Sequence, residues 1–135
     1  MAFMEWSEDL ATGIHLIDTR HRWLVETTNR LHDALDDSPP QRALIGEILN
    51  SLMDYTVNHF INEEYLFQFL GYPALAEHQA EHNRFTARIL DLLQRHEAGE
   101  AVGVEVLESL KDWLVHHTMG SDKDYVPFLL AHGVR

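Results

Sequence analysis

The chain has 135 residues, of which 45% are hydrophobic and 24% charged, and this is the length and composition of one globular domain over residues 1–135. Its formal net charge of −12 disfavours nucleic acid and anionic membrane surfaces as partners, because both are bound through clustered lysine and arginine. Without cysteine, without an apolar run of membrane-spanning length and without a signal-like start, the sequence excludes disulfides and membrane insertion and predicts a cytoplasmic protein.

Glycine and proline divide the chain into segments whose apolar residues recur at the helical steps of three and four. Asp18 can cap the start of the first helix, and Gly71 fits a left-handed cap at the end of the second. We expect an all-α fold, an antiparallel up-down-up-down four-helix bundle with short connections. Its parts are an N-terminal arm (1–17), helices over about 18–37, 41–70, 74–97 and 104–119, and a short C-terminal segment (122–131).

Potential metal ligands replace hydrophobic residues on the core-facing stripes of these helices. In the predicted topology they all fall at one end of the bundle, and they are His21, His59, Glu63, His78, His82 and His117. His59 and Glu63 are four residues apart, as are His78 and His82, so each pair projects from one face of its helix. Because a buried polar group without a partner costs roughly 1–3 kcal/mol, this layer is expected to hold metal.

A second carboxylate, Asp122, follows His117 by five residues. On a regular helix this spacing would point the two side chains away from each other. Gly120 lies between them and can end or distort the helix, which would bring Asp122 to the same site. By contrast, His116 falls on the polar face of the last helix, and Glu64 falls off its stripe, so both are expected in solvent.

The type of donor narrows the choice of metal. Imidazole and carboxylate without thiolate suit iron, zinc, copper or manganese. A catalytic zinc site takes three protein ligands and water, which is fewer than the seven donors present here. Two iron ions bridged by two carboxylates and an oxygen atom would use all seven and leave one position free. The majority of neutral imidazole, unlike the carboxylate majority of the di-iron oxygenases, favours binding of dioxygen over its cleavage.

Four stretches that together span nearly the whole chain resemble the hemerythrin family, and within it the bacterial hemerythrins. They are WSEDLATGIHLIDTRH (6–21), NHFINEE (58–64), HQAEH (78–82) and WLVHHTMGSDKDY (113–125). The resemblance implies two iron ions, Fe2+ or Fe3+, with a bridging oxo or hydroxo group. One iron would be bound by His78, His82 and His117 and the other by His21 and His59, with Glu63 and Asp122 as bridges.

The same resemblance implies an apolar oxygen pocket at the open position of the second iron. It would be lined by Leu24, Phe60, Trp113 and Leu114. The chain departs from the usual family pattern at two positions. Arg20 stands where glutamine often precedes the first histidine, and Thr118 stands in the pocket where isoleucine often follows the fifth. Neither departure removes a ligand.

The expected function is reversible dioxygen binding, for storage or for delivery to an oxygen-consuming enzyme, rather than catalysis. Two alternatives use the same site: a di-iron oxidoreductase that scavenges peroxide or nitric oxide, and an oxygen or iron sensor. The sequence offers no obvious acid beside the pocket for the first, and 135 residues leave no room for a fused signalling domain. A monomer is expected, because the outer faces are largely polar and residues such as Val102 and Val104 form no persuasive patch.

Overall fold

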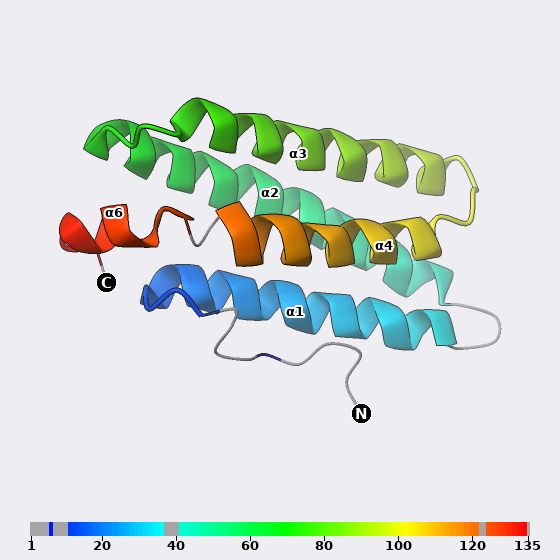
Figure 1. Ribbon diagram of the computed structural model, residues 1–135. Coiled ribbons are helices and arrows are strands. Elements are labelled where there is room, and N and C mark those ends of the chain that lie inside the picture. The colour runs from blue at the N-terminus through cyan, green and yellow to red at the C-terminus, as the bar shows by residue number, and fades with distance from the viewer. Residues whose placement is uncertain (1–5, 7–10, 37–40, 122–123, 135) are drawn as a thin grey trace.

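Four helices lie side by side and antiparallel, so the chain runs up and down the bundle as predicted (Figure 1). The structure is a computed structural model that describes residues 6, 11–36, 41–121 and 124–134, and for residues 118–121 only the backbone. The helices of the bundle are α1 (His15–Asp36), α2 (Arg42–Leu70), α3 (Leu75–Glu97) and α4 (Gly103–Trp113). Each packs against two others, α2 against α1 and α3, and α4 against α1 and α3.

Two elements complete the C-terminal part. A π-helix, η2 (Leu114–Ser121), continues α4 directly, and a short helix, α6 (Val126–Ala131), lies beyond it at the same end of the bundle (Figure 1). The sequence predicted one regular helix over 104–119 with a distortion at Gly120. The structure places the change of helix type earlier, at Leu114, one residue after the α-helix ends.

The ends of the helices follow the local chemistry of the sequence. Gly71 adopts the predicted left-handed conformation with φ of 76°, and the N–H of Tyr72 donates to the carbonyl of Phe67 over 2.9 Å. This is a Schellman cap, completed by contact between the Phe67 and Tyr72 rings at 4.8 Å.

The first helix begins three residues earlier than predicted, at His15. Asp18 therefore lies inside the first turn rather than at the capping position. Its carboxylate accepts hydrogen bonds from the backbone N–H and the hydroxyl of Thr12, each over 2.7 Å, and from the N–H of Gly13 over 3.2 Å. Asp18 therefore holds the preceding arm in place and, contrary to the prediction from the sequence, does not cap the start of the helix.

The apolar side chains form two buried clusters. The larger fills the bundle between the four helices and includes Leu31, Ile48, Leu52, Ile89 and Leu110. The smaller lies at the end covered by α6 and consists of Ile14, Ile17, Phe67, Tyr125 and Leu129. Val102, which the sequence analysis took as an outer residue, is buried in the larger cluster, whereas Val104 is exposed as expected.

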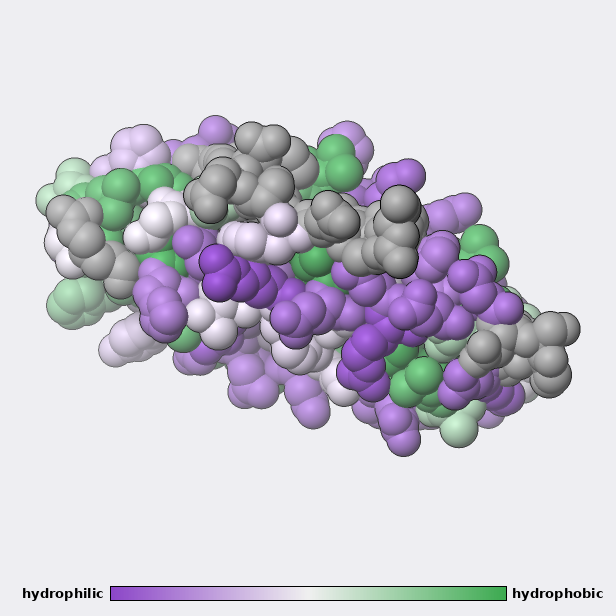
Figure 2. All heavy atoms as spheres, turned by 90° about the horizontal axis from the view of Figure 1, so that it is seen from below, coloured by the Kyte–Doolittle hydropathy of each residue, from purple (hydrophilic) through white to green (hydrophobic). Residues whose placement is uncertain are grey.

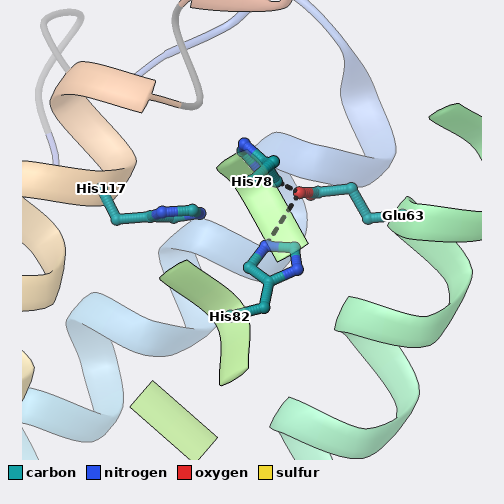
Figure 3. A group of neighbouring side chains, drawn as sticks. All are labelled: Glu63, His78, His82 and His117. Atoms are coloured by element: carbon teal, nitrogen blue, oxygen red, sulfur yellow. Dashed lines mark hydrogen bonds and ion pairs between the residues drawn. The ribbon is translucent and has the colours of Figure 1, made fainter. Parts of the chain in front are cut away.

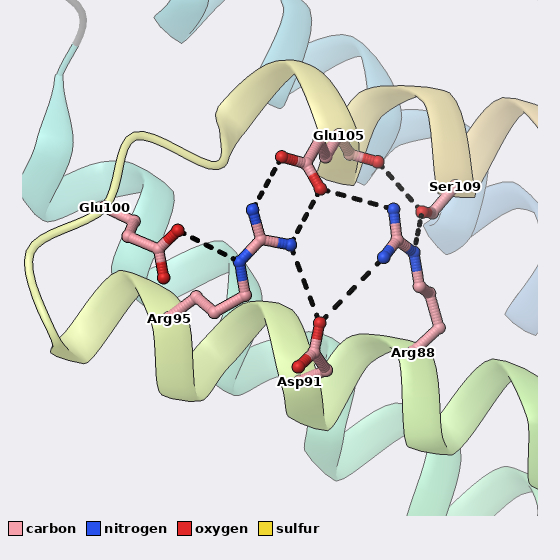
Figure 4. Close-up of polar contacts among 6 residues, drawn as sticks. All are labelled: Arg88, Asp91, Arg95, Glu100, Glu105 and Ser109. Carbon is pink, nitrogen blue, oxygen red and sulfur yellow. Dashed lines mark hydrogen bonds and ion pairs between the residues drawn. The ribbon is translucent and has the colours of Figure 1, made fainter.

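On the outside, an ion-pair network joins α3 to α4 (Figure 4). The guanidinium of Arg95 donates to both carboxylate oxygens of Glu105 over 2.8 Å and to Glu100 over 3.3 Å. Arg88 donates to the hydroxyl of Ser109 over 3.3 Å and to Glu105 over 3.4 Å. These contacts fix α4 against α3 on the half of the bundle away from α6.

The surface is mostly hydrophilic, with apolar residues in a few places. Seen from below, the middle of the molecule is hydrophilic and hydrophobic residues gather towards the end at which α1 begins (Figure 2). On α2 a row of exposed apolar residues follows the four-residue spacing of one helix face: Val57, Ile61, Tyr65 and Phe69. Over the described ranges, no helix is both long and apolar enough to cross a membrane.

Candidate metal centre

The six predicted histidine and glutamate ligands are all buried in one layer of the bundle. Between 0% and 4% of each residue is exposed, although all of them are polar: His21, His59, Glu63, His78, His82 and His117. They come from α1, α2, α3 and η2. They are buried because each occupies a core-facing position in its helix. Apolar side chains of both clusters are buried along the same helices, and the donor layer is almost fully shielded from bulk water.

Glu63 lies at the centre of this layer, and its two carboxylate oxygens face different histidines. Oε1 is 2.6 Å from Nε2 of His78 and 3.2 Å from Nε2 of His82 (Figure 3). Oε2 is 3.1 Å from Nε2 of His59. One carboxylate therefore joins two imidazoles of α3 to one of α2.

This arrangement fixes the charge on Glu63. Burial alone would raise the pKa of its carboxyl, but hydrogen bonds with His59, His78 and His82 hold that pKa well below its usual value. A buried carboxylate that stays ionised among imidazole nitrogens is a negatively charged donor for a metal cation.

Four of the donors are close enough to share one metal ion. Ligand atoms of Glu63, His78, His82 and His117 all lie within 4.8 Å of one another (Figure 3). The donor set, three imidazoles and a carboxylate, is one that iron or zinc accepts. The residues present therefore fit a metal ion at this position.

Of the two remaining histidines, His59 contacts the second carboxylate oxygen of Glu63 and His21 lies beside His59. The His21 ring is wholly buried and meets the His59 ring edge to face, with centroids 6.2 Å apart. His59 is joined to the four-donor group through Glu63, and His21 is next to His59. The structure thus brings these six residues into one layer, with Glu63 in contact with His59 on one oxygen and with His78 and His82 on the other.

Two further residues of the predicted site, Asp122 and the side chain of Thr118, lie outside the described part of the chain. The helix that carries His117 is not a regular α-helix, because η2 has π-helical geometry from Leu114 to Ser121. The distortion was predicted at Gly120, and the structure places the change of helix type before His117 instead.

The four predicted pocket residues with described side chains are buried, and the two aromatic ones contact the ligands. Leu24 and Leu114 are fully buried, Phe60 and Trp113 nearly so. The Phe60 ring stacks on His82 with centroids 3.8 Å apart, and the Trp113 ring stacks on His117 at 3.7 Å. Both aromatic residues therefore touch the three-histidine set, and Phe60 also lies 5.7 Å from His59.

Two carboxylates beside the layer were not predicted as part of it. Oε2 of Glu64 is 2.9 Å from Nδ1 of His82, and Oε2 of Glu81 is 2.5 Å from Nδ1 of His117. Glu64 was expected in solvent, but only 22% of its side chain is exposed. In the sequence, the one feature that marks these two carboxylates is that each is next to a predicted ligand. Glu64 follows Glu63, and Glu81 precedes His82. His116 is exposed, as expected.

Comparisons with known proteins agree with this geometry. Residues 12–129 match the family model of the hemerythrin HHE cation binding domain. A bacteriohemerythrin of Stenotrophomonas maltophilia is 39% identical over 98% of this chain and 85% of its own length. A bacteriohemerythrin of Methylococcus capsulatus is 37% identical over 97% of this chain and its whole length. A crystal structure of wild-type hemerythrin superposes with a TM-score of 0.83 at 36% identity, covering 93% of this chain and 97% of that one.

Proposed function

This chain belongs to the hemerythrin family, and we propose that it binds dioxygen reversibly at a non-haem di-iron centre. The oxygen would be stored or passed to an oxygen-consuming system. The observation that carries the proposal is the position of Glu63, whose Oε1 faces His78 and His82 and whose Oε2 faces His59. A carboxylate that faces two sets of imidazoles has the geometry of a bridge between two metal ions.

In this proposal His78, His82 and His117 would hold the first iron, and His21 and His59 would hold the second. Glu63 and Asp122 would supply carboxylate donors to both ions, which would share an oxo or hydroxo group. When bound, the two ferrous ions would supply the electrons for holding dioxygen reversibly. His21 and His59 would offer the second ion fewer protein donors, which would leave room there for dioxygen.

The surrounding side chains favour release over reaction. Leu24, Phe60, Trp113 and Leu114 are buried and exclude water, which would otherwise promote loss of the held oxygen in reduced form. Catalysis that cleaves dioxygen or peroxide needs a proton donor directed at the oxygen. The nearby acids Glu64 and Glu81 contact the Nδ1 edges of His82 and His117 instead. We therefore propose a carrier rather than an enzyme.

The test is the optical spectrum of iron-loaded protein through reduction, exposure to oxygen and deoxygenation, with iron counted per chain. About two irons per chain and a charge-transfer band that appears with oxygen and fades on its removal would support the proposal. Immediate oxidation without an oxygen-bound form would favour an oxidoreductase or a sensor. Retention of zinc in place of iron would overturn the di-iron assignment.

The same proposal includes a monomer in the cytoplasm. For the monomer the test is light scattering at several protein concentrations. The exposed row of Val57, Ile61, Tyr65 and Phe69 is the surface at which self-association would arise. A mass of two chains that falls to one on Tyr65→Ser would show that the monomer is wrong.

A further inference from the structure

His82 is held between two carboxylates, one at each ring nitrogen. Its Nδ1 is 2.9 Å from Oε2 of Glu64, and its Nε2 is 3.2 Å from Oε1 of Glu63. A neutral imidazole carries one N–H, and an ionised carboxylate only accepts hydrogen bonds. Metal binding through Nε2 requires the lone pair on that nitrogen, which places the hydrogen on Nδ1, where Oε2 of Glu64 lies close enough to accept it.

His117 is held in the same way from another helix. Its Nδ1 lies 2.5 Å from Oε2 of Glu81, and the ring is stacked on Trp113. The opposite nitrogen, Nε2, is buried, and the ring points towards Glu63 and the histidines of α3 (Figure 3). Glu81 thus fixes both the tautomer and the direction of the imidazole.

Both carboxylates reach from the layer towards solvent. The exposed fractions of the Glu64 and Glu81 side chains are 22% and 32%, against 1% and 4% for the two histidines they contact. Glu81 also lines a groove of about 350 Å³ between α3 and α4, beside Arg84 and Arg88. These two carboxylates therefore sit outside the donor layer and act on it through the rings.

We propose that Glu64 and Glu81 are positioning residues that direct Nε2 of His82 and His117 at the metal and set its affinity and reduction potential. A carboxylate on the far nitrogen increases the electron donation of an imidazole, which strengthens its bond to the metal and favours the ferric state. This inference rests on the proposed function for its iron, but not for its geometry.

The first experiment measures zinc binding to the metal-free protein by competition with a chromophoric chelator. Glu64→Ala and Glu81→Ala are each expected to weaken zinc binding about 10–100-fold. Glu77→Ala is the matched control, because Glu77 precedes His78 on α3 as Glu81 precedes His82, but is exposed. Zinc affinity in both alanine variants equal to that of Glu77→Ala would overturn the inference.

The second experiment separates orientation from charge. In Glu64→Gln and Glu81→Gln the amide oxygen still accepts the Nδ1–H, so most of the zinc affinity is expected to remain. The midpoint potential of the iron-loaded glutamine variants should rise, because the negative charge is gone. An unchanged potential in both would contradict the electronic part of the inference. If an alanine variant fails to fold, the glutamine variants still test whether Glu64 and Glu81 affect the metal through the two histidines.

The third readout is the imidazole proton itself. In the zinc-loaded protein, nuclear magnetic resonance should show strongly deshielded, slowly exchanging Nδ1–H signals for His82 and His117, each lost with its alanine variant. Nδ1 as the zinc-bound nitrogen would overturn the assignment. Zinc binding involves no dioxygen, so a wild-type protein that fails to bind oxygen would contradict the proposed function and leave this inference intact.

Discussion

The ring of Phe60 lies parallel to the imidazole of His82, with centroids 3.8 Å apart and 3° between the planes. Phe60 comes from α2 and His82 from α3, so the stack joins two helices at the level of the proposed metal. It holds one face of the ring while Glu63 and Glu64 hold its edges.

Replacement of this ring should weaken metal binding beyond its effect on folding. Phe60→Leu is expected to lower the free energy of unfolding of the metal-free protein by about 1–3 kcal/mol, as measured in urea. Phe85→Leu is the control, because Phe85 is also buried but stacks on Trp113 rather than on a proposed ligand. Only Phe60→Leu should also lose zinc affinity. Equal zinc affinity in the two variants would show that the stack serves packing alone.

Glu63 should be essential for stabilisation by metal. Zinc at one hundred times its dissociation constant is expected to stabilise the wild-type fold by about 2.7 kcal/mol. In Glu63→Gln the central negative charge is replaced by a neutral amide, so the rise in Tm on addition of zinc should be largely lost. Thermal unfolding with and without zinc measures this. A full shift in Glu63→Gln, equal to that of Glu77→Gln, would exclude Glu63 as a ligand.

A methyl group at Gly103 should disturb the end of the bundle away from the metal. A Cβ there would clash with Cδ2 of Leu35 and lie 3.3 Å from Cδ1 of Ile45. Gly103→Ala is expected to cost about 1–3 kcal/mol of stability in urea unfolding, with zinc binding unchanged. Combined with Leu35→Ala, its cost should shrink. Strict additivity of the two changes would show that this clash is not the cause.

The Arg95–Glu105 ion pair should make stability depend on pH in the acid range. Hydrogen bonds from Arg95 lower the pKa of Glu105 below its ordinary value of 4.5. A lowered folded-state pKa stabilises the fold above 4.5, and this contribution disappears as the pH falls through the folded-state pKa. The metal-free wild type should therefore have a slightly higher Tm than Glu105→Gln at neutral pH, and the difference should vanish in acid.

The pair is exposed, so the effect on Tm is small and should decrease with added salt. Glu108→Gln provides the comparison, because Glu108 is exposed on the same helix. An identical loss of Tm in Glu105→Gln and Glu108→Gln, at every pH, would show that the ion pair does not stabilise the fold.

Much of the fold and the donor layer could be predicted, because both depend on helical periodicity. The three-and-four spacing placed the helices to within a few residues, and it put His59 with Glu63 and His78 with His82 on inward faces. The antiparallel topology then brought these residues to one level. The helical period and the order of the four segments are therefore enough to predict that these residues lie in one layer.

Other features depend on contacts between helices, which periodicity does not describe. Glu81 lies off the core-facing stripe of α3 and reaches His117 only because η2 passes beside it. The early change of helix type at Leu114 has no glycine or proline to mark it. The predicted start of α1 was three residues late because an aspartate near the start of a helix is typical of a capping residue. Asp18 instead accepts hydrogen bonds from the arm while lying inside the first turn.

The donor layer draws on α1, α2, α3 and η2, with its members close to one end of the bundle. A cation bound there would cross-link the four segments, so that this end of the bundle would unfold as one cooperative unit. The other end is held by side-chain packing, by the Arg95 network and by hydrogen bonds from Arg42 to the backbone carbonyls of His96 and Glu100, so its helices can fray without opening the metal end. Loading with metal thus changes not only how stable the molecule is but where along its length it first comes apart.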